Sequence, residues 1–474
     1  MFCHGAFGAK IVAFLSLHLR LLYMSPIEIR ATLSLAGLFS LRMLGLFMIL
    51  PVFAIYGAEY DGATALLVGI AIGAYGLTQA VLQIPFGLLS DRVGRKPIIV
   101  FGLILFCAGS ILAATAESIY GVIAGRALQG AGAIASTVMA LLTDLTSDEN
   151  RTKAMASVGA SIGVSFSIAL VLGPVLASLM GIAGIFWLTA VLAVVGILVA
   201  LFVVPAPKTN QTHRDSRPVI GQFWEVARSK ELFRLNIGVF MLHLFMTACF
   251  VVLPLLLLNE IELPHEQHWM VYFPILLVSF IAMVPLMIIA ESRRKIRQVF
   301  LLAIAMLAIS LGALSLWHSS LVSLCAGLFL FFWAFNLLEA MLPSMVSKIA
   351  PAGSKGTSMG AYSSSQFLGA FFGGLCGGFV YGEMGLSSVF LICSMLALLW
   401  FIIAFGMQQP RFLHSYRVVL NGVQASDSDL IRRFLEVEGV EEAIIAADEN
   451  AAYLKVDKNC LDDEHLGLIS NAAA

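Results

Sequence analysis

Long apolar segments separated by short polar ones dominate the chain. Runs of about 20 apolar residues, the length of a helix that crosses a bilayer, recur from residue 34 to residue 408. We predict twelve spans, at 34–56, 64–89, 98–115, 119–143, 154–180, 182–204, 236–258, 269–290, 299–316, 319–344, 357–382 and 386–408. Hydrophobic residues make up 59% of the 474 positions and charged residues only 12%, which indicates an integral membrane protein.

Lys and Arg residues are distributed unevenly among the predicted loops. The loops on the same side as the N-terminus contain Arg92, Arg95, Lys96, Arg151, Lys153, Lys208, Arg214, Arg217, Arg228, Lys230, Arg234, Arg293, Arg294, Lys295, Arg297, Lys348 and Lys355. The loops on the opposite side contain neither Lys nor Arg. Because cytoplasmic loops carry the excess of Lys and Arg, we expect both termini in the cytoplasm.

The polar segments also divide the chain into regions. Residues 1–23 read as a leader or a misassigned start, and we favour Met24 as the true start, because 11–23 is too short to span and is interrupted by His18 and Arg20. We expect a first six-span half at 24–205, a basic linker with an amphipathic segment at 206–235, and a second half at 236–410.

A small α+β domain is predicted at 411–474. Strand patterns at 417–421, 442–446 and 452–456, a capping box at 426–429 that starts a helix, and a last helix at 462–469 give the order of a ferredoxin-like unit. Acidic residues outnumber basic ones here, which argues against nucleic-acid binding. A regulatory contact with the cytoplasmic face and a homotypic contact both remain open.

A basic loop with glycines at fixed spacing lies between the second and third predicted spans, at 87–97. Its motif residues are Gly87, Asp91, Arg92, Gly94, Arg95 and Lys96. The loop resembles the signature loop of major facilitator superfamily transporters. The resemblance implies two six-helix halves and alternating access, with the loop as a conformational switch that favours the outward-open state. It also implies an ion pair between Arg95 and Asp144, and Asp91 facing the N-terminal end of the eleventh helix.

Two further motifs are similar to superfamily sequences. The segment 125–130 resembles a motif of the fourth helix, in which an arginine, here Arg126, is implicated in proton coupling. Gly173 and Pro174 resemble the core of a helix-packing motif of drug/proton antiporters. Three glycines expected around that core are replaced by small residues, at Ala169, Ala177 and Ser178.

Three ionisable residues inside the spans are candidates for proton coupling, namely Glu339, Arg126 and Arg42. A charge at membrane depth is costly and is usually functional, and the Glu339 carboxyl could gain and lose a proton during transport. The alternatives are structural. Arg42 could extend to the interface, Arg126 could bond backbone carbonyls, and Glu339 could pair with either arginine.

Polar residues in the spans are candidates for the lining of a substrate cavity, namely Tyr75, Gln79, Gln83, His243, Asn336 and Gln366. Duplicated halves place such a cavity between them, near the bilayer midplane. Hydrogen bonding between helices is the alternative for Tyr75, Gln79 and Gln83. The seven cysteines show no metal-ligand spacing, so we expect no metal and no cofactor. We also find no nucleophile–base set and expect no enzyme.

The sequence therefore predicts a proton-coupled antiporter that exports small, lipophilic molecules by alternating access. The resemblance implies a multi-pass protein of the bacterial inner membrane, whose partners are the bilayer, protons and the substrate. Two alternatives remain. One is a pH-independent uniporter or importer, and the other is a membrane sensor that signals through 411–474 without transport.

Overall fold

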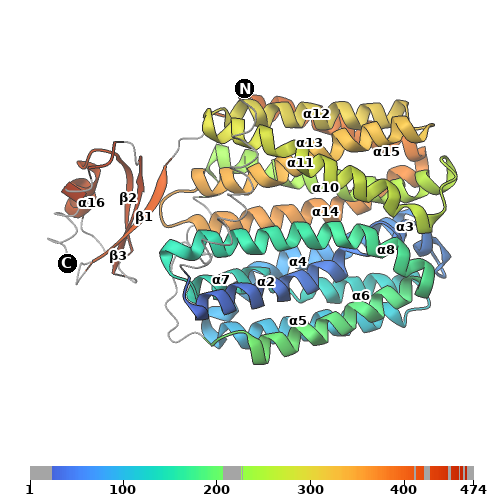
Figure 1. Cartoon of the computed structure of the whole chain (residues 1–474), viewed down its shortest axis with the longest axis horizontal. Helices are drawn as coiled ribbons and strands as arrows, with labels where there is room; N and C mark the ends of the chain where they lie inside the picture. The colour runs from blue at the N-terminus through green and yellow to red at the C-terminus, as the bar shows by residue number, and fades with distance from the viewer. Residues whose placement is uncertain are drawn as a thin grey trace, which may run out of the picture.

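The protein is described by a computed structural model that covers residues 24–206, 226, 228–409, 413–420, 428–446, 450–457, 460–462 and 465–466. The predicted leader, most of the linker, the start of the 426–429 capping box and most of the last predicted helix lie outside these residues. The described part is a long helical bundle with a small sheet domain at one end (Figure 1). We call this end of the bundle the domain end and the opposite one the far end.

Ten helical segments of the described residues are long and apolar enough to cross a membrane. They are α2 (Pro26–Phe47), α4 (Ala65–Val93), α5 (Arg95–Ala114), α8 (Asp148–Leu198) with η3 (Val199–Val203), α10 (Lys230–Asn259), α11 (Trp269–Ser292), α12 (Ile296–Leu316), α13 (Leu321–Ile349), α14 (Lys355–Met384) and α15 (Leu386–Phe405). Short helices complete the bundle, at α3 (Phe53–Tyr56), η2 (Gly57–Glu59), α6 (Ile119–Ala131), α7 (Ala135–Asp144) and η6 (His265–Gln267).

These ten segments are consistent with twelve crossings for two reasons. The fourth predicted span is divided into α6 and α7 by non-helical residues at 132–134, so neither piece is long enough alone. The segment 148–203 contains two antiparallel helices, because Gly181 adopts a positive φ of 66°. Both ends of this segment lie beside the start of α2. The Ser147 amide donates to Glu28, and Arg30 donates to the Val203 carbonyl.

The two halves share one way of fixing their last helices. In the first half, Arg30 and Lys96 donate to carbonyls at the end of η3, with Lys96 Nζ 2.9 Å from the Val204 oxygen. In the second half, Arg234 Nη1 donates to the Gly406 oxygen at 2.9 Å and Arg297 Nε to the Met407 oxygen at 2.6 Å. Basic side chains stabilise the unpaired carbonyls of a helix C-terminus, so the repeat predicted between the halves extends to these contacts.

The halves meet mainly where α4 crosses α14. A Cβ added at Gly69 would overlap the backbone of Gly374, and one added at Gly374 would overlap the Gly69 carbonyl. Small residues let membrane helices approach this closely. The seam extends toward the domain end, where Ser364 Oγ donates to the Ala80 carbonyl at 3.1 Å.

The far ends of the halves also touch. The helix α3 packs against α10, and η6 packs against α8. The ring of Tyr56, from the first half, meets the ring of His265, from the second half, edge-on with centroids 5.6 Å apart.

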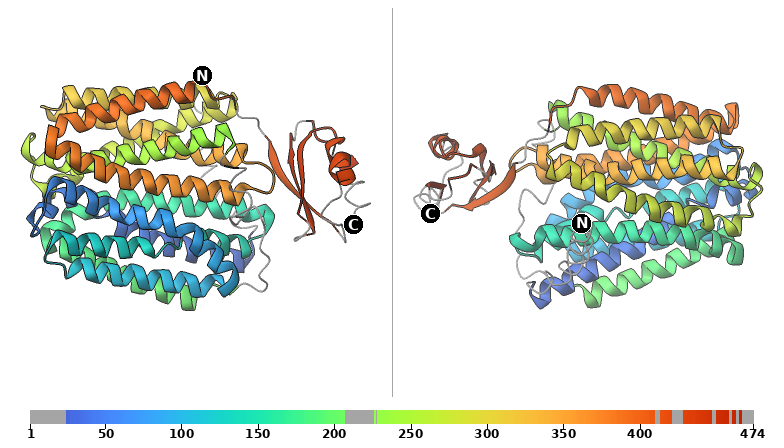
Figure 2. Two further views of the ribbon diagram at one scale, coloured as in Figure 1. Left: turned by 180° about the vertical axis from the view of Figure 1, so that it is seen from behind. Right: turned by 45° about the horizontal axis from the view of Figure 1, so that its top comes forward.

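The appended domain is an antiparallel sheet of three strands with one described helix. Its strands β1 (His414–Val419), β2 (Val440–Ala446) and β3 (Ala451–Val456) lie in the order β1-β3-β2, and α16 (Ser428–Leu435) packs on one face. The sheet lies between α16 and the bundle (Figure 2). These elements confirm the strand–helix–strand–strand order predicted from the sequence.

Candidate gating network and intramembrane polar centres

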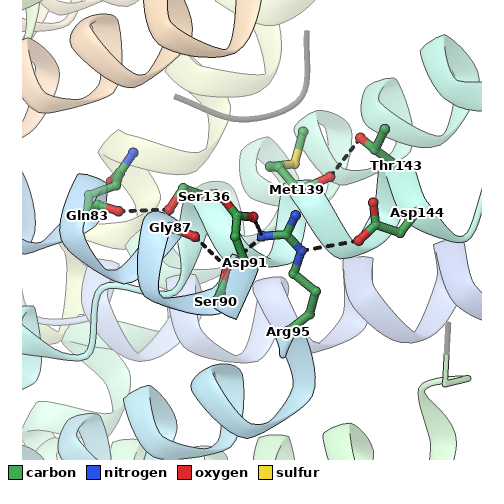
Figure 3. A network of polar contacts seen from close by, with 9 residues as sticks. All are labelled: Gln83, Gly87, Ser90, Asp91, Arg95, Ser136, Met139, Thr143 and Asp144. Carbon is green, nitrogen blue, oxygen red and sulfur yellow. Dashed lines mark hydrogen bonds and ion pairs between the residues drawn. The ribbon is translucent and has the colours of Figure 1, made fainter. Parts of the chain in front are cut away.

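A buried ion-pair network joins the domain-end termini of three helices of the first half (Figure 3). Arg95, at the start of α5, forms an ion pair with Asp91 of α4 and another with Asp144 of α7, where Nε lies 3.1 Å from Oδ2. The side chains of Arg95 and Asp144 are 2% and 1% exposed. The pairing between Arg95 and Asp144 implied by the family resemblance is therefore present.

Local backbone geometry places the arginine in this network. Gly94 ends α4 with a φ of 108°, which residues with a side chain rarely adopt, and α5 begins at the next residue. Arg95 Nη1 also donates to Ser90 Oγ at 2.7 Å, and the Ser90 hydroxyl donates to the Gly87 carbonyl. Ser90 was missed by sequence reasoning, although its place directly before Asp91 in the motif could have identified it.

The other basic residues of the signature loop lie apart from this network. Lys96 bonds the end of η3, as described above, and Arg92 is exposed. Of the basic residues of the loop, Arg95 therefore belongs to the network and Lys96 caps a helix end. The predicted contact between Asp91 and the N-terminal end of α14 stays a prediction.

Two buried arginines surround one aromatic ring within the first half. The guanidinium carbons of Arg42 and Arg126 lie 5.7 Å and 5.4 Å from the ring centroid of Tyr75, and Phe106 covers Arg42 at 5.6 Å. Both arginines are at most 2% exposed. An arginine over an aromatic face gains a favourable cation–π interaction when it is desolvated, so these rings stabilise the two buried charges.

The hydrogen bonds of both arginines go to neutral acceptors. Arg42 Nη2 donates to Gln79 Oε1 at 2.7 Å and to the Gly132 carbonyl at 2.9 Å, at the break between α6 and α7. Gln79 in turn donates to Gln83. Tyr75, Gln79 and Gln83 are thus buried between helices in this structure, with 3%, 0% and 3% exposure, and their predicted role in a cavity stays a prediction.

Arg126 is held by the backbone of α4 and by its own helix. It donates to the Ala71 and Ile72 carbonyls and, at 2.8 Å, to Gln129 Oε1. Gln129 donates to Ser110 Oγ of α5 at 2.8 Å. Sequence reasoning missed Gln129, whose position one helical turn after Arg126 could have signalled it.

A second polar centre lies in the second half, where three helices meet. Glu339 of α13 accepts a hydrogen bond from Gln366 Nε2 of α14 at 3.3 Å, and its Oε2 lies 3.7 Å from His243 Nε2 of α10. Gln366 Nε2 and His243 Nε2 are 2.8 Å apart. The Glu339 side chain is 38% exposed, whereas that of His243 is 9% exposed. Three residues that were predicted separately thus form one cluster.

Two neighbours extend this centre. Asn336, one turn before Glu339, donates to Ser279 Oγ of α11 at 3.1 Å. Tyr362, one turn before Gln366, is 4% exposed and its hydroxyl makes no hydrogen bond with the described residues. No periodic signal distinguishes this tyrosine from a packing residue in the sequence. The polar partners of Glu339 found among the described residues are His243 and Gln366, not the arginines.

Gly173 and Pro174 of the antiporter-like motif lie in α8. A Cβ added at Gly173 would meet the backbone oxygen of Met48, directly after α2. This contact is compatible with the predicted role in helix packing.

Among the described residues, no group of three or more His, Cys, Asp or Glu side chains could hold a metal ion.

Comparison with known proteins assigns the fold to a family. The family model of the Major Facilitator Superfamily matches residues 35–374 and 235–415, and the model of the YajR YAM domain matches residues 416–461. The chain belongs to the major facilitator superfamily. It is similar to the inner membrane transport protein YajR of Escherichia coli K12, with 48% identity over 92% of this chain and 95% of the relative. An uncharacterized transporter of Buchnera aphidicola from Baizongia pistaciae is 36% identical over 79% and 95% of the two chains.

Two solved transporter structures share the fold of this chain. The human organic anion transporter MFSD10 superposes with a TM-score of 0.61 and 23% identity, over 80% of this chain and all of that chain. A mutant form of the nucleoside transporter NupG superposes with a TM-score of 0.62 and 14% identity, over 79% and 99% of the two chains. At these identities the likeness establishes the architecture alone.

Proposed function

We propose that this superfamily transporter exports small molecules in exchange for protons, with Glu339 as the proton-binding group. The observation that carries the proposal is the cluster of Glu339, His243 and Gln366. An intramembrane carboxylate is a functional candidate by default, and this one combines partial exposure with contacts to two other helices. It can therefore exchange protons and change helix packing when it does.

The hydrogen bonds suggest how protonation would act. His243 Nδ1 lies 3.2 Å from the Val239 carbonyl, and a ring nitrogen can bond a carbonyl only as a donor. In the neutral tautomer that this selects, Nε2 accepts from the Gln366 amide, which also donates to Glu339. A proton on Glu339 removes its charge and adds a donor, so Gln366 and His243 must redistribute their bonds. This links protonation to the packing of α10, α13 and α14.

The remaining parts of the proposal come from the first half and from the relatives. The Arg95 network would stabilise the state in which the domain end is closed, and Arg126 and Arg42 would influence the protonation of Glu339. We assign the domain end, both termini and the appended domain to the cytoplasm, and the protein to the bacterial inner membrane. Relatives named multidrug resistance proteins, such as MdtH of Edwardsiella ictaluri at 25% identity, favour export of small, lipophilic substrates.

The experiment measures lumenal pH in proteoliposomes under an imposed proton gradient while candidate compounds, lipophilic cations first, are added one at a time. We expect substrate-dependent collapse of the gradient by the wild type. Glu339→Gln should abolish it, whereas Glu383→Gln, at the exposed far end of α14, should not. Coupled proton movement in Glu339→Gln would refute the role of Glu339. Substrate flux that does not depend on pH would indicate a uniporter or importer. Substrate binding without flux would indicate a sensor.

A further inference from the structure

Both faces of the sheet in the appended domain are covered, by different parts of the chain. All six residues of the central strand β3 are buried. Ala452, Leu454 and Val456 face the domain core with α16. Ala451 and Tyr453, on the opposite face, pack with Ala352, which belongs to the turn between α13 and α14. A small sheet domain of this kind would otherwise expose that face to solvent.

A buried lysine marks the same contact. Lys455 is 3% exposed, which is rare for lysine unless its ammonium group is paired. Its Nζ donates to the carbonyl oxygens of Ser347 and Lys348, each at 3.3 Å, in the last turn of α13. A cation at a helix C-terminus satisfies orphan carbonyls and complements the helix dipole. The domain thus supplies a cap for the end of α13.

Two further contacts hold the turn that follows. The Ala352 amide donates to Glu442 Oε2 of β2 at 3.1 Å. Gly353 has a φ of 69°, and a Cβ added to it would lie 3.6 Å from the Tyr453 ring. Glu442 and Tyr453 thus meet Ala352 and Gly353, two consecutive residues of the turn. Lys455, from the same face of the sheet, meets the last turn of α13 directly before it.

The turn held by the sheet domain joins the two helices that carry Glu339 and Gln366. The helix α13 also carries Glu339, nine residues before Lys348 and so about 13 Å away along the axis, and α14 carries Gln366. Lys348 forms an ion pair of 2.8 Å with Glu291 at the end of α11.

We propose that the sheet face formed by Glu442, Ala451, Tyr453 and Lys455 is an interaction surface whose partner is the α13–α14 turn of the same chain. Docking there restrains the ends of the two helices that carry Glu339 and Gln366. The domain is thus a regulatory clamp on the second half, whatever the transported molecule is.

Hydrogen exchange of the full-length protein in lipid nanodiscs tests the clamp. Lys455→Met removes the ammonium group and keeps an unbranched apolar side chain, while Ala352→Glu introduces a carboxylate opposite Glu442 without changing the domain. Arg433→Met, on exposed α16, is the matched control. We expect the amides of 345–358 to exchange at least about fivefold faster in both test variants, the factor that loss of one hydrogen bond contributes, and at the wild-type rate in the control.

Protection of β2 and β3 reports whether the domain stays folded. If Lys455→Met loses that protection, the test rests on Ala352→Glu, because this substitution leaves the sequence of the appended domain unaltered. Wild-type exchange of 345–358 in a test variant with a folded domain would overturn the proposal. Equal acceleration in Arg433→Met would do so as well, because the effect would then not depend on the docked face.

Discussion

Replacing Arg95 by methionine should be the most destabilising single change in the signature-loop network. The arginine is shared by two carboxylates, Asp91 and Asp144, and its side chain is 2% exposed. Methionine keeps the apolar volume but removes the cation. Breaking a buried ion pair by removing one partner costs about 3–5 kcal/mol, because the remaining charge is uncompensated.

Removing the charge of Asp144 instead should lower the free energy of unfolding by a smaller amount. Asp144→Asn leaves Arg95 paired with Asp91 and keeps an oxygen that can accept a hydrogen bond, so we expect about 1–3 kcal/mol. The double variant Arg95→Met/Asp144→Asn should be more stable than Arg95→Met alone, since one fewer carboxylate has lost its cation. The stability effects of substitutions at neighbouring residues of one network do not add. The expected order of stability of these variants follows from which charges each one leaves unpaired.

Unfolding by SDS in mixed micelles, followed by tryptophan fluorescence, measures these differences. Each 1.4 kcal/mol is a tenfold change in the equilibrium constant, so the first two variants should be clearly separated. Arg92→Met is the matched control, because Arg92 lies in the same loop and is exposed. Equal losses for Arg95→Met and Asp144→Asn, or a double variant less stable than both, would refute the reasoning.

Two further predictions concern helix packing and helix ends. Gly69→Ala should destabilise the protein by about 1–3 kcal/mol through overpacking against Gly374, whereas Gly159→Ala, where no neighbour lies within 4 Å, should stabilise it by up to about 1 kcal/mol. The same SDS titration measures the change in the free energy of unfolding for both variants. An equal loss of stability in Gly159→Ala and Gly69→Ala would contradict the close packing of α4 on α14. Lys96→Met and Arg297→Met should each cost about 1 kcal/mol by uncapping a helix and add independently in the double variant. A clearly non-additive loss would show that the two caps are coupled.

Much of the architecture could be predicted because each part has a local signal. A membrane helix needs about 20 apolar residues, and Gly, Pro and charged residues mark its ends. The predicted spans 154–180 and 182–204 meet at Gly181, and this residue separates the two helices within 148–203. The limit appears in the fourth predicted span, which non-helical residues at 132–134 divide without a local signal that marks the break.

The site was predictable in residue type more than in pairing. The ion pair of Arg95 with Asp144 was implied by the family resemblance, because the resemblance indicates which residues lie close together in space. Lys96 stands next to Arg95 in the motif, but its direction on the helix takes it to the end of η3. Adjacent residues on a helix point about 100° apart, so a motif written as one string can serve two different contacts.

The grouping of Glu339 with Arg42 and Arg126 shows a further limit. Charge alone favours pairing an acid with a base, yet aromatic rings and neutral oxygens stabilise both arginines within the first half, although Arg42 Nε and Nη1 have no hydrogen-bond acceptor among the described residues. Glu339 has its polar partners in the second half.

One helix pair connects the two polar centres. The helix α4 supplies the carbonyls that hold Arg126 and the Gln79 that holds Arg42. The helix α14, packed directly on α4, supplies Gln366 to Glu339. Because the glycines of this seam bring the two backbones into direct contact, a displacement of α14 that accompanied a change at Glu339 would act first on α4. The helix that holds both arginines is therefore packed against a helix that holds the carboxylate, although no ion pair joins them.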